Sequence, residues 1–129
     1  MTFVLVHGAW HGGWCWVKVT RLLTDGAHTV FTPTLTGLGE RAHLARPEVD
    51  LDTHVEDLVQ VLETEELRNV VLVGHSYGGM VVTGAAARVP NRIARLVYLD
   101  AYVPEAGQSA LSLMPPERAD AVRKSAESA

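Results

Sequence analysis

The feature that most constrains this chain is a series of short apolar runs, separated by turn signals and helical segments. The runs are Phe3 to Val6, His28 to Thr32, Val70 to Val73 and Leu96 to Leu99. Short continuous apolar runs are typical of strands buried on both faces of a sheet. Strands that alternate with helices predict right-handed βαβ units. We therefore expect an α/β protein with a mostly parallel sheet and flanking helices.

Three segments between these runs have helical patterns. Trp14 to Thr24 predicts a helix that ends with Gly26 as its C′ glycine. Thr53 and Glu56 fit a capping box, with Thr53 as N-cap. An apolar stripe with helical spacing follows that box and comprises Val55, Leu58, Val59 and Leu62. Met80 to Arg88 is small and apolar nearly all round, which suits a helix buried against the sheet.

The remaining segments predict the domain organisation. Residues 34–50 are rich in Gly, Thr, Arg and Pro and predict a loop. Beyond Pro104 the pattern weakens, although Glu117 to Ser128 has the composition of a helix. We expect residues 1–103 to form the N-terminal part of a core and residues 104–129 to begin a cap or peripheral segment.

Composition excludes several classes of protein. The 129 residues carry 11 basic and 15 acidic side chains, a formal net charge of −4, which argues against a nucleic-acid partner. No apolar stretch is long enough to span a membrane, and the N-terminus lacks a basic segment typical of signal peptides. The single cysteine, Cys15, cannot form an internal disulfide, so a cytoplasmic location is expected. No motif indicates a metal or an organic cofactor.

The segment Gly74-His75-Ser76-Tyr77-Gly78 is a G-x-S-x-G pattern between an apolar run and the predicted buried helix. In that context it is typical of a nucleophile elbow, a sharp strand-to-helix turn that exposes a serine hydroxyl. The turn strains the serine backbone, and side chains at Gly74 and Gly78 would collide with neighbouring atoms. The alternative is a glycine turn of a nucleotide-binding unit.

A second turn, His7-Gly8-Ala9-Trp10, follows the first apolar run. A backbone N–H from such a loop, with the N–H of the residue after the nucleophile, forms an oxyanion hole. The two donors predicted here are the amides of Ala9 and Tyr77. An ordinary strand-to-helix turn is the alternative for this loop taken alone.

Together these motifs resemble the α/β-hydrolase superfamily, in particular the branch of methylesterases and hydroxynitrile lyases. The segments that carry the resemblance are residues 7–10, Trp14, residues 34–41, residues 74–79 and residues 99–104. The resemblance implies a parallel sheet with a central nucleophile strand and hydrolysis of small carboxylic esters through an acyl-serine at Ser76. It also leaves cyanohydrin cleavage, which uses the same serine, as an alternative chemistry.

The histidines depart from the family pattern. They are His7, His11, His28, His43, His54 and His75. In the α/β-hydrolase fold the triad follows the chain order Ser, Asp or Glu, then His, and none of these six follows Ser76. We expect His75 to pack beside the elbow and His7 to be a structural, hydrogen-bonded residue.

Further residues are candidates for the pocket. Trp10 and His11 lie on the first loop and are predicted to contact substrate. Asp100 follows the fourth run and is a possible triad acid, although an aspartate there also caps backbone amides. We expect Trp14 and Trp16 to pack the first helix.

Three hypotheses follow. The chain is the N-terminal part of a serine esterase, a protein that binds ligand without turnover, or an enzyme whose base comes from a partner chain or an unusual histidine. The expected partners are a small ester substrate and either a second copy of the chain or a complementing C-terminal segment, since a sheet that ends at its fourth strand leaves an open edge.

Overall fold

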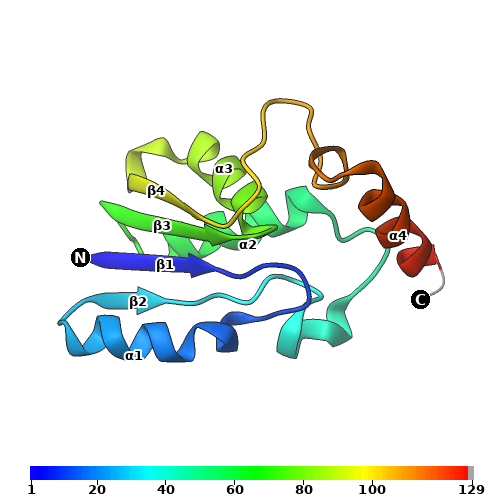
Figure 1. The fold of residues 1–129 in the computed structure, drawn as a ribbon. Helices are drawn as coiled ribbons and strands as arrows, with labels where there is room; N and C mark the ends of the chain where they lie inside the picture. Colours follow the sequence, from blue (N-terminus) through cyan, green and yellow to red (C-terminus); the bar gives the residue numbers. More distant parts are fainter. Residues whose placement is uncertain (128–129) are drawn as a thin grey trace.

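The computed structural model describes residues 1–127 and contains one four-stranded sheet (Figure 1). The strands are β1 (Thr2–Val6), β2 (Thr29–Phe31), β3 (Val70–His75) and β4 (Ile93–Leu99), in the order β2-β1-β3-β4. All three strand pairs are parallel. The predicted fold class is therefore confirmed, and the strand that leads to Ser76 lies in the interior of the sheet.

Helices cover both faces of this sheet (Figure 1). The α-helices are α1 (Val17–Asp25), α2 (Leu51–Thr64), α3 (Gly78–Arg88) and α4 (Pro116–Glu127). Short 3₁₀ segments lie at Gly13–Trp16, Gly39–Leu44, Pro90–Arg92 and Leu111–Leu113. In Figure 1, α4 lies beyond the arrowheads of the strands, at the edge where parallel sheets collect functional groups.

Alternate residues of the strands pack on opposite faces, because successive side chains of a strand point to opposite sides. Val4 and Leu72 join the larger core with Leu58 of α2 and Val81 of α3. Leu5, Val71 and Val73 join a smaller core with Trp16. The continuous apolar runs in the sequence thus reflect burial on both faces of the two central strands.

The helix boundaries correct two predictions. The N-cap of α2 is Asp50 and not Thr53. The Asp50 carboxylate accepts from the Thr53 amide at 3.0 Å, and the Thr53 hydroxyl oxygen accepts from the Asp50 amide. Gly26 has a φ of −80°, and the left-handed position predicted for it is occupied by Ala27 at +65°. The N-cap of α2 thus lies three residues before the predicted position, and the left-handed residue after α1 lies one residue after it.

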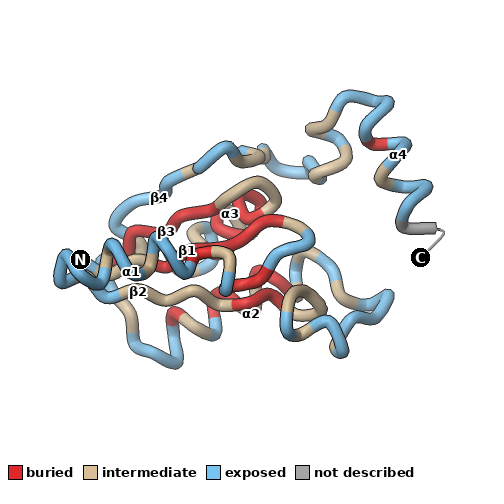
Figure 2. Tube along the Cα trace, turned by 60° about the horizontal axis from the view of Figure 1, so that its bottom comes forward, coloured by how far each residue is buried: buried red, intermediate tan, exposed pale blue. Residues whose placement is uncertain are grey.

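Burial is uneven across the sheet (Figure 2). Figure 2 shows β1, β3 and α3 largely buried, whereas α1 and β4 are mostly exposed. Leu96, Val97 and Leu99 of the edge strand β4 are 37%, 38% and 50% exposed. Trp16 is buried as predicted, but Trp14 is 58% exposed, so its predicted packing role is wrong.

The C-terminal part agrees with the predicted helix, which begins at Pro116 instead of Glu117. Proline at a first helical position loses nothing, because its missing N–H would have no partner in the helix. Ser128 and Ala129 lie outside the described residues. Within residues 1–127, no helix combines the length and apolarity that crossing a membrane requires.

Candidate active site

Ser76 occupies the turn between β3 and α3. Its φ of +54° lies in the left-handed region, which a side chain rarely adopts and which costs free energy. Two backbone hydrogen bonds hold this conformation: the Ser76 carbonyl accepts from the Gly79 amide at 3.0 Å and from the Tyr102 amide at 3.1 Å. The serine backbone is thus strained and held in place from both sides.

Glycines allow close backbone contacts around this turn. A Cβ added to Gly74 would lie 2.6 Å from the Gly78 carbonyl oxygen. A Cβ on Gly78 would lie 2.5 Å from the carbonyl oxygen of Val6 and 2.9 Å from that of His7. Side chains at Gly74 and Gly78 would therefore collide with the backbone, as predicted. The start of α3 lies directly against the end of β1.

The loop after β1 packs against Ser76. A Cβ added to Gly8 would lie 3.0 Å from the Cβ of Ser76 and 3.5 Å from its Oγ. Ala9 follows directly, and Trp10 has a positive φ of 63°. The two loops that carry the predicted oxyanion donors therefore meet at the serine; the roles of Ala9 and Tyr77 remain predictions.

His7 connects this loop to the chain that follows β2. It is fully buried; its Nδ1–H donates to the Gly8 carbonyl at 2.7 Å, and its Nε2 accepts from the Leu35 amide at 3.0 Å. Nε2 accepts only when the ring is neutral. Burial lowers the pKa of His7, although the hydrogen bond to Gly8 acts in the opposite direction. His7 is thus a structural histidine, as predicted.

We predict that His7 makes the stability of the fold pH-dependent. In the unfolded chain His7 has its ordinary pKa of 6.5, whereas burial in the folded chain lowers this pKa, so that the folded protein takes up the proton only at a lower pH. The free energy of unfolding is then highest above pH 6.5 and falls as the pH is lowered below 6.5. Urea unfolding between pH 5 and pH 8 measures this slope.

The variant H7Q removes the titrating ring and is expected to cost about 1–3 kcal/mol at neutral pH, because the flexible glutamine amide replaces the two hydrogen bonds of the buried ring only in part. In H7Q the slope below pH 6.5 is reduced, whereas in H43Q, which changes an exposed histidine, it is unchanged. Equal slopes in H7Q and the unmodified protein would contradict the assignment.

A cavity of about 270 Å³ opens beside Ser76. Its lining comprises His75, Ser76, Asp100, Ala101, Tyr102 and Arg118. Asp100 follows β4 and has a φ of +46°, a second strained residue at the same cavity. The structure therefore brings Ser76 and Asp100 to one cavity, and Arg118 of α4, which sequence reasoning missed, lines it as well.

Trp10 and His11 do not line the cavity at Ser76. Trp10 is 78% exposed, and His11 donates from Nδ1 to the Ala9 carbonyl at 2.8 Å. His11 instead lines a separate cavity of about 230 Å³, together with Trp16 and His75. The His75 ring packs edge-on against Trp16, with centroids 6.3 Å apart, beside the elbow as predicted. Substrate contact by Trp10 or His11 remains a prediction.

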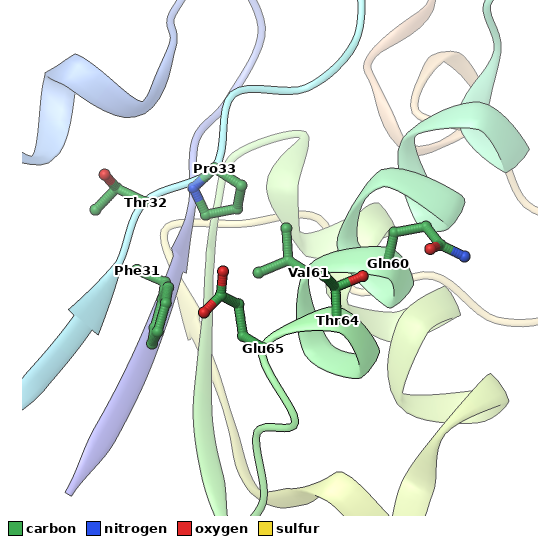
Figure 3. A pocket seen from close by; sticks show the side chains of 7 residues that line it. All are labelled: Phe31, Thr32, Pro33, Gln60, Val61, Thr64 and Glu65. Carbon is green, nitrogen blue, oxygen red and sulfur yellow. The ribbon is translucent and has the colours of Figure 1, made fainter.

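A larger cavity of about 440 Å³ lies between the end of β2 and α2 (Figure 3). Its lining comprises Phe31, Thr32, Pro33, Gln60, Val61, Thr64 and Glu65. None of the predicted site residues is among them, so size alone does not identify the site. In the part of the chain that the structure describes, no group of three His, Cys, Asp or Glu side chains is placed to hold a metal ion.

Sequence reasoning also missed a hydrogen-bond network behind the elbow. The Tyr77 hydroxyl lies 2.8 Å from Nδ1 of His54, and Nε2 of His54 lies 2.8 Å from the Thr36 carbonyl oxygen. One signal was present in the sequence. His54 lies beside Val55 on the apolar face of α2, where a polar side chain needs partners.

The sequence matches the profile of the alpha/beta hydrolase family over residues 3–128. It is 57% identical over 113 residues to the carbendazim hydrolyzing esterase of Nocardioides sp. (strain SG-4G), covering 88% of this chain and 47% of that protein. It is 37% identical over 103 residues to methylesterase 10 of Arabidopsis thaliana, covering 79% and 38%. The chain thus spans less than half the length of these curated relatives.

Solved structures agree with the sequence relatives. An extracellular alpha/beta-hydrolase from a Paenibacillus species superimposes with a TM-score of 0.89 at 32% identity, over 96% of this chain and 50% of that one. A methylesterase from Arabidopsis superimposes with a TM-score of 0.76 at 36% identity, over 84% and 46%. The family profile and the Paenibacillus structure cover nearly the whole chain, and the Arabidopsis structure covers 84% of it. The chain therefore belongs to the alpha/beta hydrolase family.

Proposed function

We propose that the protein carrying this chain hydrolyses small carboxylic esters, with Ser76 as the nucleophile. The observation that carries the proposal is the strained Ser76 in the lining of a cavity of about 270 Å³, with Gly8 of the first loop packed against it. The names of the relatives, an esterase and several methylesterases, support a small ester.

In the proposed reaction, Ser76 Oγ attacks the ester carbonyl carbon and loses its proton to a base. The amides of Ala9 and Tyr77 donate to the carbonyl oxygen as it becomes negative. Collapse of the tetrahedral intermediate breaks the bond to the alcohol, which leaves with a proton from the protonated base, and forms acyl-Ser76. Water then attacks the acyl group, releases the acid and restores Ser76.

We propose that the base is supplied by a segment beyond these 129 residues, since the chain covers only 47% of its relative from Nocardioides. The fold delivers its triad histidine after the serine, and no histidine follows Ser76 here. The exposed apolar strand β4 gives such a segment a place to pair, because β4 is an edge strand of the described sheet and lies next to the nucleophile strand. We therefore propose that a complementing C-terminal segment extends the sheet at β4.

The experiment is covalent labelling of the complete protein with a fluorophosphonate, followed by peptide mass analysis. We expect one adduct, on the peptide that contains Ser76, and parallel loss of ester hydrolysis. S76A is expected to take up no label, whereas S112A, which changes an exposed serine, labels like the unmodified protein. Labelling of another residue, or hydrolysis that survives complete labelling of Ser76, would refute the proposal.

A further inference from the structure

A buried histidine outside the predicted site contacts the elbow. His54 is 7% exposed and lies on the inner face of α2. Its ring meets the Tyr77 ring edge-on, with centroids 5.6 Å apart at 78°. Both ring nitrogens lie 2.8 Å from a partner: Nδ1 from the Tyr77 hydroxyl and Nε2 from the Thr36 carbonyl.

The partners determine where the hydrogens lie. A carbonyl oxygen only accepts, so His54 Nε2 carries the hydrogen that is donated to Thr36. In the neutral ring Nδ1 then accepts, and the Tyr77 hydroxyl donates to it. Burial raises the pKa of the Tyr77 phenol above its ordinary value, so that hydroxyl keeps its proton. His54 therefore links Thr36 to Tyr77 by one hydrogen bond at each of its ring nitrogens.

Thr36 belongs to a segment that also holds the first loop. We call residues 34–41 the brace. Within it, the Leu35 amide donates to His7, and the Thr34 hydroxyl oxygen accepts from the Gly13 amide at 2.8 Å. The brace is thus bonded to residues on both sides of Ala9.

Two side chains fix the brace itself. The amide and the hydroxyl of Thr36 both donate to the Asp57 carboxylate at 2.7 Å. The Arg41 guanidinium donates to the Thr34 carbonyl at 2.8 Å and lies 3.9 Å from Asp57. Asp57 and His54 lie one turn apart on α2, so this helix holds the brace through both residues and the elbow through His54.

We propose that His54 is a positioning residue for the oxyanion hole, which holds the Tyr77 amide at a fixed place relative to the brace and the Ala9 loop. This inference rests on the proposed role of Ser76. His54 touches no reacting atom; it acts through Tyr77. A displacement of a catalytic donor by about 1 Å costs up to about a hundredfold in rate, so the bond from His54 to Tyr77 affects kcat.

The test compares H54F, H54Q and Y77F in the complete protein, with Q60A as the matched control on the exposed side of α2. Phenylalanine keeps a flat ring but makes neither hydrogen bond, whereas the glutamine amide carries both a donor and an acceptor. We measure kcat and KM for an activated aryl ester, together with urea unfolding to correct for stability.

We expect H54F and Y77F each to lower kcat about tenfold with KM changed by less than about twofold. The double variant H54F/Y77F is expected to be no slower than either single variant, because both remove the same link. H54Q recovers part of the lost kcat. A drop in stability with kcat unchanged, or fully additive losses in the double variant, would overturn the inference.

A second readout separates this inference from the proposed function. Hydrogen exchange of the Met80 amide, which donates to the Tyr77 carbonyl at 2.9 Å, is followed by NMR in the same variants. It is expected to accelerate in H54F and Y77F, but not in Q60A. If ester hydrolysis survives in S76A, the proposed function fails, and the Met80 amide still tests the link. An exchange rate of this amide that is the same in H54F as in Q60A would overturn the role of His54.

Discussion

Replacing Ser76 with alanine is expected to lower kcat for ester hydrolysis by about 10⁴- to 10⁶-fold in the complete protein. The acyl intermediate cannot form without Oγ, so only the oxyanion hole and substrate binding contribute to the remaining rate. Because the alanine fits the same turn, the KM and the free energy of unfolding should change little. Initial rates measured with an activated ester at enzyme concentrations in the micromolar range reveal a loss of this size.

The matched control is S112A, in a short 3₁₀ segment where the Ser112 hydroxyl donates to the Ser109 carbonyl at 2.7 Å. It should hydrolyse esters at the unmodified rate. A rate in S76A within about tenfold of the unmodified protein would mean that the chemistry proceeds without an acyl-serine, since nucleophile loss costs far more than that.

Replacing Gly78 with alanine is expected to lower the free energy of unfolding by about 3 kcal/mol, the upper part of the range for overpacking. The added Cβ would lie 2.5 Å from the Val6 carbonyl oxygen and 2.9 Å from that of His7. Both atoms belong to the backbone, so neither rotates away. The start of α3 must move, and with it the serine turn.

Urea unfolding of G78A measures this effect, and G26A is the control. Gly26 has an ordinary φ of −80°, and its added Cβ would meet first the His28 side chain, at 3.3 Å. We expect G26A to change stability by less than about 1 kcal/mol. Similar values for G78A and G26A would show that the contact between α3 and the end of β1 relaxes without cost.

The sheet was predictable because its strands are short apolar runs with clear ends. The runs near Phe3 and Val71 became the two central parallel strands, since burial on both faces leaves no room for polar residues, and the run near Val97 became the exposed edge strand β4. The cap of α2 was not predictable from local spacing alone. Both Asp50 with Thr53 and Thr53 with Glu56 have the three-residue spacing, and the structure uses the first.

Only the part of the site that is formed by consecutive residues could be predicted from the sequence. The turn at Ser76 is encoded within five consecutive residues and stands where the pattern places it. Arg118 reaches the same cavity from α4, and His54 reaches Tyr77 across 23 positions of sequence. Such contacts depend on how helices pack against the sheet, which periodicity does not report. The exposure of Trp14 also depends on how the elements pack, so the sequence pattern did not predict it.

The pairing of β1 with β3 has a consequence for folding kinetics. Val6 pairs with Gly74, so the last residue before the first loop is beside the first residue of the serine turn. These partners are far apart along the chain, and closing so long a loop is slow compared with forming α2 or α3. We therefore expect the proposed oxyanion hole to form late in folding, and only in molecules whose central strands are paired in the native register. Reactivity of Ser76 during refolding would report that pairing.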